Sequence, residues 1–168
     1  MTNARERMHG RRRALAAISL AMLVPSPPLR AQALPDRFDP ARDAARDLDA
    51  ALAKARAERK RVIVDVGGEW CSWCHILDRF FAANPGLLAW REAHYVWLKV
   101  NFSRANENRA LLSRWPAVAG YPHLFVLDAG GALVHSQDTS ELEEGKGYSL
   151  AKVRAFLERH AAPLGAKA

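Results

Sequence analysis

The chain has 168 residues, enough for one domain with a hydrophobic core and too few for two comfortable ones. Apolar residues make up 49% of it and charged residues 26%, which is typical of a soluble globular protein. The net charge of +7 lies mostly at the N-terminus, because residues 1–33 hold six of the 25 basic residues and one of the 18 acidic residues, leaving +2 for the rest. No basic stripe carries interleaved aromatic residues, so we expect no nucleic-acid partner.

The N-terminal residues carry the pattern of a secretory signal. Arg11, Arg12 and Arg13 form a basic start, residues 14–24 are apolar, and residues 31–33 read Ala-Gln-Ala, a typical cleavage site. The apolar run is about half as long as the roughly 20 residues that cross a membrane. We therefore predict a signal peptide at residues 1–33, by the general or the twin-arginine route, and one domain at 34–168 without stable membrane insertion. A short membrane anchor or an unstructured tail is the alternative.

The first half of the domain alternates helix and strand patterns. Asp39 followed by Pro40 predicts a helix start, and apolar residues then recur at helical spacing as far as residue 60. The β-branched run RVIVDV, residues 61–66, predicts a buried strand that Gly67 and Gly68 end. A further helix is predicted over residues 71–83, CSWCHILDRFFAA.

The second half continues the alternation. We expect helices at 87–93 and 106–115, a strand at 94–102, a loop at 116–122, paired strands at 123–128 and 132–136, a loop at 139–149 and a helix at 150–161. The final helix is predicted to turn Leu150, Val153, Phe156 and Leu157 inward. This order predicts an α/β fold, in which helices cover both faces of a central mixed sheet that ends in a hairpin.

The stretch EWCSWCH, residues 69–75, allows three kinds of site. Cys-x-x-Cys-His is the attachment pattern of a c-type haem, but all three methionines lie in residues 1–33, so a second axial ligand would have to be another histidine. A structural zinc site needs four ligands, and one cysteine pair supplies half of them. A strand directly before the pair favours the third kind, a reversible dithiol, which needs no cofactor and no metal.

The dithiol interpretation assigns a role to each cysteine. At a strand-to-helix junction Cys71 would lie at a helix N-terminus, where free N–H groups favour a thiolate, so Cys71 is the predicted nucleophile. Cys74, one turn further and closer to the core, is the predicted resolving thiol. A purely structural disulfide explains the pair poorly, because a bridge across so short a loop stabilises little.

The segments VIVDVGGEWCSWC and GYPHLFVLDAGGALV together resemble the thioredoxin superfamily, over roughly residues 40–160. The resemblance, which is to exported bacterial members, implies a thioredoxin fold. It implies that Asp65 is a buried acid that relays protons for Cys74, with a raised pKa. It also implies that Trp70 shields the nucleophile, and that Pro122 is a cis-proline which, with Tyr121, contacts substrate. Here Ser72 and Trp73 separate the cysteines, and His75 replaces a common lysine; Trp73 offers a docking surface.

The same resemblance implies a function. We expect a periplasmic thiol–disulfide oxidoreductase, specifically a protein-disulfide reductase, because Asp65 and the Glu69-Trp70-Cys71 surroundings look like those of reducing members. Its partners would be protein or small-molecule thiols and disulfides, with a membrane thiol carrier as electron donor, and the chain is expected to be a monomer. A disulfide oxidase or isomerase is the alternative within the class. A thioredoxin-fold binding module without catalysis is the alternative outside it.

Overall fold

A computed structural model describes residues 33–162, so the predicted signal peptide lies outside the described residues except for Ala33. The domain is built on a four-stranded sheet with the strand order β2-β1-β3-β4. Its strands are β1 (Arg61–Gly67), β2 (Tyr95–Asn101), β3 (His123–Leu127) and β4 (Leu133–Asp138). β1 pairs with β2 in parallel and with β3 in antiparallel, and β3 and β4 form the predicted hairpin. The mixed sheet predicted from the sequence is confirmed.

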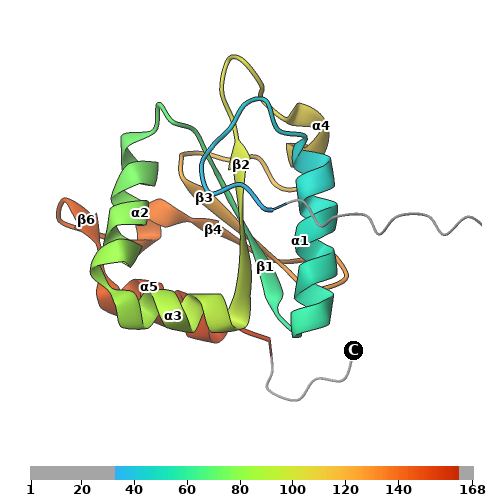
Figure 1. The fold of residues 1–168 in the computed structure, drawn as a ribbon. Coiled ribbons are helices and arrows are strands. Elements are labelled where there is room, and N and C mark those ends of the chain that lie inside the picture. Colours follow the sequence, from blue (N-terminus) through green and yellow to red (C-terminus); the bar gives the residue numbers. More distant parts are fainter. Residues whose placement is uncertain (1–32, 163–168) are drawn as a thin grey trace, which may run out of the picture. The chain divides into compact units, whose positions relative to one another are not determined.

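Helices cover both faces of this sheet (Figure 1). On one face lies α1 (Ala44–Glu58), with the short α4 (Arg109–Leu112) beside it. On the other lie α2 (Ser72–Ala83), α3 (Pro85–His94) and α5 (Leu150–Arg159). None of the helices within residues 33–162 has the length and hydropathy needed to cross a membrane.

The alternation of β1 decides which side chains reach which face. Val62, Val64 and Val66 pack against α1, whereas Ile63 packs into the cluster formed with α2, α3 and α5. Because successive side chains of a strand point to opposite faces, Asp65 points to the same face as Ile63. The acidic residue of the central strand is thereby directed toward the helix that carries both cysteines.

The first helix begins later than the sequence predicted. Asp39 caps a single turn, accepting the Ala41 N–H with its carboxylate and the Arg42 N–H with its carbonyl, and the helix begins only at Ala44. Asp43 is the true N-cap, because its carboxylate accepts two backbone N–H groups of the first turn. The stretch before α1 therefore forms a loop, and Arg42 near its end donates to the Ala33 carbonyl at its start, at 3.1 Å.

Three further expectations are corrected. The helix predicted at 106–115 is only the single turn of α4, because Asn106 and Asn108 form turns, and Asn108 takes a left-handed conformation. The segment predicted as a loop at 139–149 holds a 3₁₀ turn (Thr139–Leu142) and a small hairpin of β5 (Glu143–Glu144) and β6 (Gly147–Tyr148). Leu150 begins α5 but is 46% exposed, unlike the inward-facing residues of the same helix.

Candidate active site

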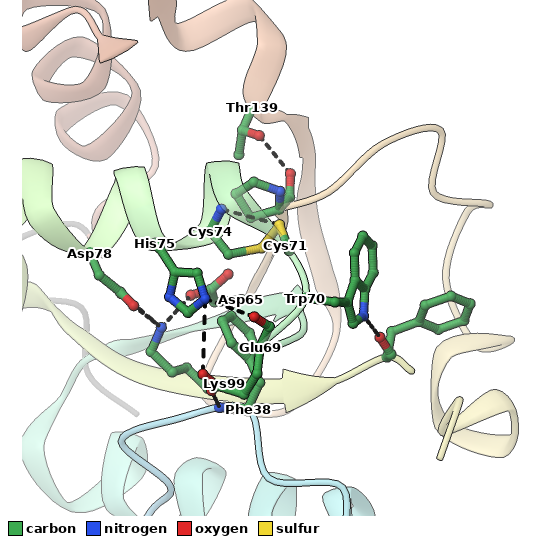
Figure 2. The surroundings of a disulfide bond; sticks show 12 residues. Phe38, Asp65, Glu69, Trp70, Cys71, Cys74, His75, Asp78, Lys99 and Thr139 are labelled. Atoms are coloured by element: carbon green, nitrogen blue, oxygen red, sulfur yellow. Dashed lines mark hydrogen bonds and ion pairs between the residues drawn. A yellow bond between two sulfur atoms is a disulfide. The ribbon is translucent and has the colours of Figure 1, made fainter. Parts of the chain in front are cut away.

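The two cysteines lie at the start of α2 and form a disulfide with an S–S distance of 2.08 Å (Figure 2). Cys71 is the N-cap of the helix, and its sulfur accepts the backbone N–H of Cys74 at 3.1 Å. Cys71 is 3% exposed and Cys74 1% exposed, so the pair is almost covered and Cys74 is the deeper of the two. The strand-to-helix junction inferred from the sequence is therefore present.

This position gives the two sulfurs different surroundings. Once the disulfide is reduced, a thiolate on Cys71 would face the free N–H groups of the first turn of α2, which stabilise a negative charge. Cys74 lies inside the first turn, one layer closer to the core, and has no such helix end to itself. The geometry favours Cys71 as the more acidic thiol and therefore as the attacking group.

Asp65 lies buried on β1, facing the same side of the sheet as α2. Its Oδ2 accepts the Trp97 indole N–H at 3.1 Å and lies 3.4 Å from Lys99 Nζ, whereas its Oδ1 has no partner. Burial raises the pKa of this carboxyl, and the nearby Lys99 ammonium opposes the effect only in part. A carboxyl held in this state can accept and return a proton at a pH where an exposed aspartate stays ionised.

The charged partners of Asp65 were not predicted from the sequence. Lys99 is buried on β2 and also donates to both carboxylate oxygens of Asp78, at 2.7 and 3.0 Å, so it bridges the two acids. Figure 2 shows the lysine side chain between Asp65 and Asp78. Two signals were present: Lys99 interrupts an apolar strand, and Asp78 follows Cys74 by one helical turn.

An aromatic group borders the other side of the disulfide. Trp70 is 58% exposed, its indole N–H donates to the Phe102 carbonyl at 2.7 Å, and its ring meets Tyr121 edge-on. Tyr121 in turn stacks on Phe102 with ring centroids 4.9 Å apart. Gly68 makes this arrangement possible, because a Cβ there would lie 2.3 Å from the indole nitrogen. Trp70 thus presents an exposed aromatic surface beside the cysteines.

The loop before β3 completes the surroundings of the disulfide. The peptide bond between Tyr121 and Pro122 is cis, and the Pro122 carbonyl accepts the hydroxyl of Thr139 at 2.5 Å. Trp73, by contrast, is half-buried and packs edge-on against Tyr148, so it contributes less to an open surface than Trp70 does. His75 bonds through Nε2 to the Glu69 carbonyl at 2.9 Å.

The burial of Asp65 predicts a stability that depends on pH. Because burial raises the pKa of Asp65, the folded protein keeps the proton to a higher pH than the unfolded chain does. The free energy of unfolding therefore falls as the pH rises from the pKa of Asp65 in the unfolded chain to its pKa in the folded protein. Asp65→Asn removes the charge and with it this loss of stability. We expect the variant to be more stable than the parent at pH 8, and the two to be nearly equal at about pH 4, where an ordinary aspartate is half protonated.

Urea denaturation of the oxidised protein at both pH values measures this difference. Asp49→Asn, at an exposed position of α1, serves as the control and should show no pH-dependent gain. A parent protein that is as stable as Asp65→Asn at pH 8 would contradict the electrostatic description of the site.

The sequence model of a family described as thioredoxin-like matches residues 43–129. These residues include the six site residues inferred from the sequence, which are Asp65, Trp70, Cys71, Cys74, Tyr121 and Pro122. The domain also resembles solved structures in its fold. Disulphide isomerase from Xylella fastidiosa Temecula1 superposes with a TM-score of 0.61 at 24% identity, over 76% of this chain and 96% of that one. The oxidised C-terminal domain of DsbD from Neisseria meningitidis gives a TM-score of 0.50 at 19% identity, over 74% and 98%.

Two curated proteins of Pseudomonas aeruginosa are similar in sequence. Thiol:disulfide interchange protein DsbD 2 is 32% identical over 112 residues, which are 56% of this chain and 19% of that protein. Thiol:disulfide interchange protein DsbD 1 is 34% identical over 85 residues, 50% of this chain and 14% of that protein. The chain thus spans less than a fifth of the length of these relatives. Since the family model covers more than half of its residues, the chain belongs to the thioredoxin-like family.

Proposed function

We propose that the chain is a thiol–disulfide oxidoreductase that reduces protein disulfides after export to the periplasm. The observation that carries the proposal is the Cys71–Cys74 disulfide at the N-terminus of α2, with the buried Asp65 on the strand beneath that helix. The similarity to thiol:disulfide interchange proteins supports the same chemistry. The reaction needs only the two sulfurs and a proton carrier, so no cofactor takes part in the proposal.

The first step is attack by Cys71. The reduced enzyme presents a Cys71 thiolate, whose sulfur forms a bond to one sulfur of the substrate disulfide, and the other substrate sulfur leaves as a thiolate. The product is a mixed disulfide between Cys71 and the substrate. The free N–H groups at the start of α2 favour the thiolate before the attack.

The second step is resolution by Cys74. Asp65, as a carboxylate, takes the proton of the Cys74 thiol, and the resulting thiolate attacks the sulfur of Cys71. The Cys71–Cys74 disulfide forms, the second substrate thiolate leaves, and two electrons have passed from the enzyme to the substrate. Asp65 then returns its proton to the departing thiolate or to solvent. Its raised pKa favours the earlier transfer, in which the carboxylate takes the proton of Cys74.

Substrate binding is assigned to the aromatic border of the site. Trp70 offers an exposed ring beside Cys71, and Tyr121 and Pro122 lie in the loop directly before β3. The buried Thr139 hydroxyl donates to the Pro122 carbonyl, and this hydrogen bond holds the turn in place. An extended substrate segment could therefore lie along Tyr121 and cover the disulfide.

Each cycle leaves the enzyme oxidised, so the proposal requires a dithiol donor. We assign this role to a membrane thiol carrier, which would supply two electrons and two protons to regenerate the cysteines. We propose that the chain acts as a monomer in this exchange.

The reduction potential of the Cys71–Cys74 couple tests the direction of the reaction. Protein recovered after export is equilibrated in redox buffers, and its free thiols are trapped and counted. A value near about −270 mV is expected for a reductase, whereas a value near about −120 mV would overturn the reducing direction and indicate an oxidase. A pair that does not cycle at all would overturn the enzyme function and leave a binding module.

A further inference from the structure

The residues before α1, residues 34–43, form a loop, which we call the strap. Two contacts hold its second half to the rest of the domain. Arg42 pairs with Asp47 of α1, and the Asn106 amide donates to the Pro40 carbonyl at 3.0 Å. These contacts hold the middle of the strap against the end of the sheet where the cysteines lie (Figures 1 and 2).

Phe38, in the middle of the strap, belongs to the redox site although it lies far from the cysteines in sequence. It is 1% exposed and forms one buried apolar cluster with Cys71 and Cys74. Its backbone N–H donates to the Glu69 carboxylate at 2.9 Å, two residues before the nucleophile. A Cβ on Gly67 would lie 2.4 Å from the Cys74 sulfur and 3.0 Å from the Phe38 ring, so ring and sulfur converge on that glycine.

The other side of the Phe38 ring faces the charged group beneath the disulfide. Lys99 Nζ lies 4.2 Å from the ring centroid, within the range of a cation–π contact. The same ammonium bridges Asp65 and Asp78. The ring therefore lies between the cysteine cluster and the ammonium that neutralises the buried acid.

We propose that Phe38 is a positioning residue of the redox site, whose ring keeps water from the Cys74 side and holds Lys99 beside Asp65. The inference rests on the proposed function, because the buried pair of Asp65 and Lys99 matters to exchange only if Asp65 carries the proton of Cys74. It assigns the strap a role in the proton step rather than in substrate binding.

Four titratable groups face Asp65. They are Lys99 of β2, Asp78 of α2, Arg91 of α3 and the neutral Tyr148 of β6. Burial is the largest cause of the raised pKa, and the Lys99 ammonium opposes it. Removing the ring admits water to the carboxylate, so the pKa of Asp65 should fall even if Lys99 becomes more mobile.

The experiment compares Phe38→Ala with Phe156→Ala. Both remove a buried phenylalanine, but Phe156 lies in α5, in a different apolar cluster from that of Phe38 and the cysteines. The Asp65 carboxyl carbon is followed by NMR against pH in the oxidised protein. We expect Phe38→Ala to move the titration down by about one pH unit and Phe156→Ala to leave it in place. Equal titrations in Phe38→Ala and the parent would overturn the inference.

A second pair of variants serves if Phe38→Ala does not fold. Glu69 is exposed, and both Glu69→Gln and Glu69→Ala remove its charge, but only glutamine keeps an oxygen that accepts the Phe38 N–H. We expect Glu69→Ala to titrate Asp65 at a lower pH than Glu69→Gln does. Identical titrations in the two variants would show that the strap does not govern the carboxyl.

The consequence for catalysis is read from the pH profile of disulfide reduction. In Phe38→Ala the acidic limb of the profile should move down with the Asp65 titration, and in Phe156→Ala it should not. If Phe38→Ala shifts the titration of Asp65 but leaves the pH profile of disulfide reduction unchanged, the positioning role is overturned. If the parent protein reduces no disulfide, the proposed function fails, whereas the NMR titration still decides whether Phe38 seals the site.

Discussion

A Cys74→Ser variant is expected to accumulate a stable mixed disulfide on Cys71, whereas Cys71→Ser is expected to form none. In the proposed mechanism Cys71, the helix N-cap, attacks first, and Cys74, deeper in the core, is needed only to release the substrate. Both variants should lose multiple turnover down to the uncatalysed background. Non-reducing electrophoresis and mass spectrometry of the protein after exposure to a disulfide-bonded substrate show which sulfur is attached.

The two variants control for each other, because each loses the same disulfide and hence the same constraint on the chain. The assigned roles would be interchanged if Cys71→Ser formed a mixed disulfide on Cys74 and Cys74→Ser formed none on Cys71. If neither variant forms an adduct while both still bind a partner protein, the chain acts as a binding module. In that case a reversible, non-covalent complex would form in place of the mixed disulfide, and a reductant would not dissociate it.

The second large effect is expected at Gly67. Alanine there places a Cβ 2.4 Å from the Cys74 sulfur and 3.0 Å from the Phe38 ring, so the oxidised site must shift to admit one methyl group. Overpacking of this kind costs about 1–3 kcal/mol in a buried region. In the reduced protein Cys74 can rotate away, so the cost should be smaller. We therefore expect Gly67→Ala to destabilise the oxidised form more than the reduced form.

Chemical denaturation of both redox forms measures the difference. Every 1.4 kcal/mol by which the oxidised form is selectively destabilised raises the reduction potential by about 30 mV, so the variant should be a stronger oxidant than its parent. Gly86→Ala is the matched control, because nothing lies within 4 Å of a Cβ at that helical position, and alanine there should stabilise by up to about 1 kcal/mol. Equal losses in both redox forms of Gly67→Ala would contradict the contact with Cys74.

Local patterns were sufficient to predict the centre of the fold. The β-branched run 61–66 can bury side chains on both faces only as a central strand, and the glycines after it place Cys71 at a helix start. The hairpin of β3 and β4 follows from its turn residues. In both cases the residues that carry the pattern lie close in the sequence to the element that they form, so their spacing alone is informative.

The remainder depended on contacts between distant segments. Lys99 looks like an ordinary strand residue until β2 pairs with β1 and brings it beside Asp65. Phe38 carries no local signal at all, since its role comes from the path of the segment before α1. Propensity also placed the start of α1 at Asp39, whereas Asp39 caps only a single turn and the carboxylate of Asp43 accepts the free N–H groups at the start of the helix itself.

The position of the strap would link maturation of the chain to its chemistry. If cleavage follows Ala33, as the sequence predicts, Phe38 is the fifth residue of the exported chain. Trimming a few residues further would leave the sheet, both cysteines and Asp65 in place but remove the ring beside Cys74. The exact cleavage point would then set the activity of the exported protein, and uneven processing would yield molecules of one fold with different proton-transfer behaviour.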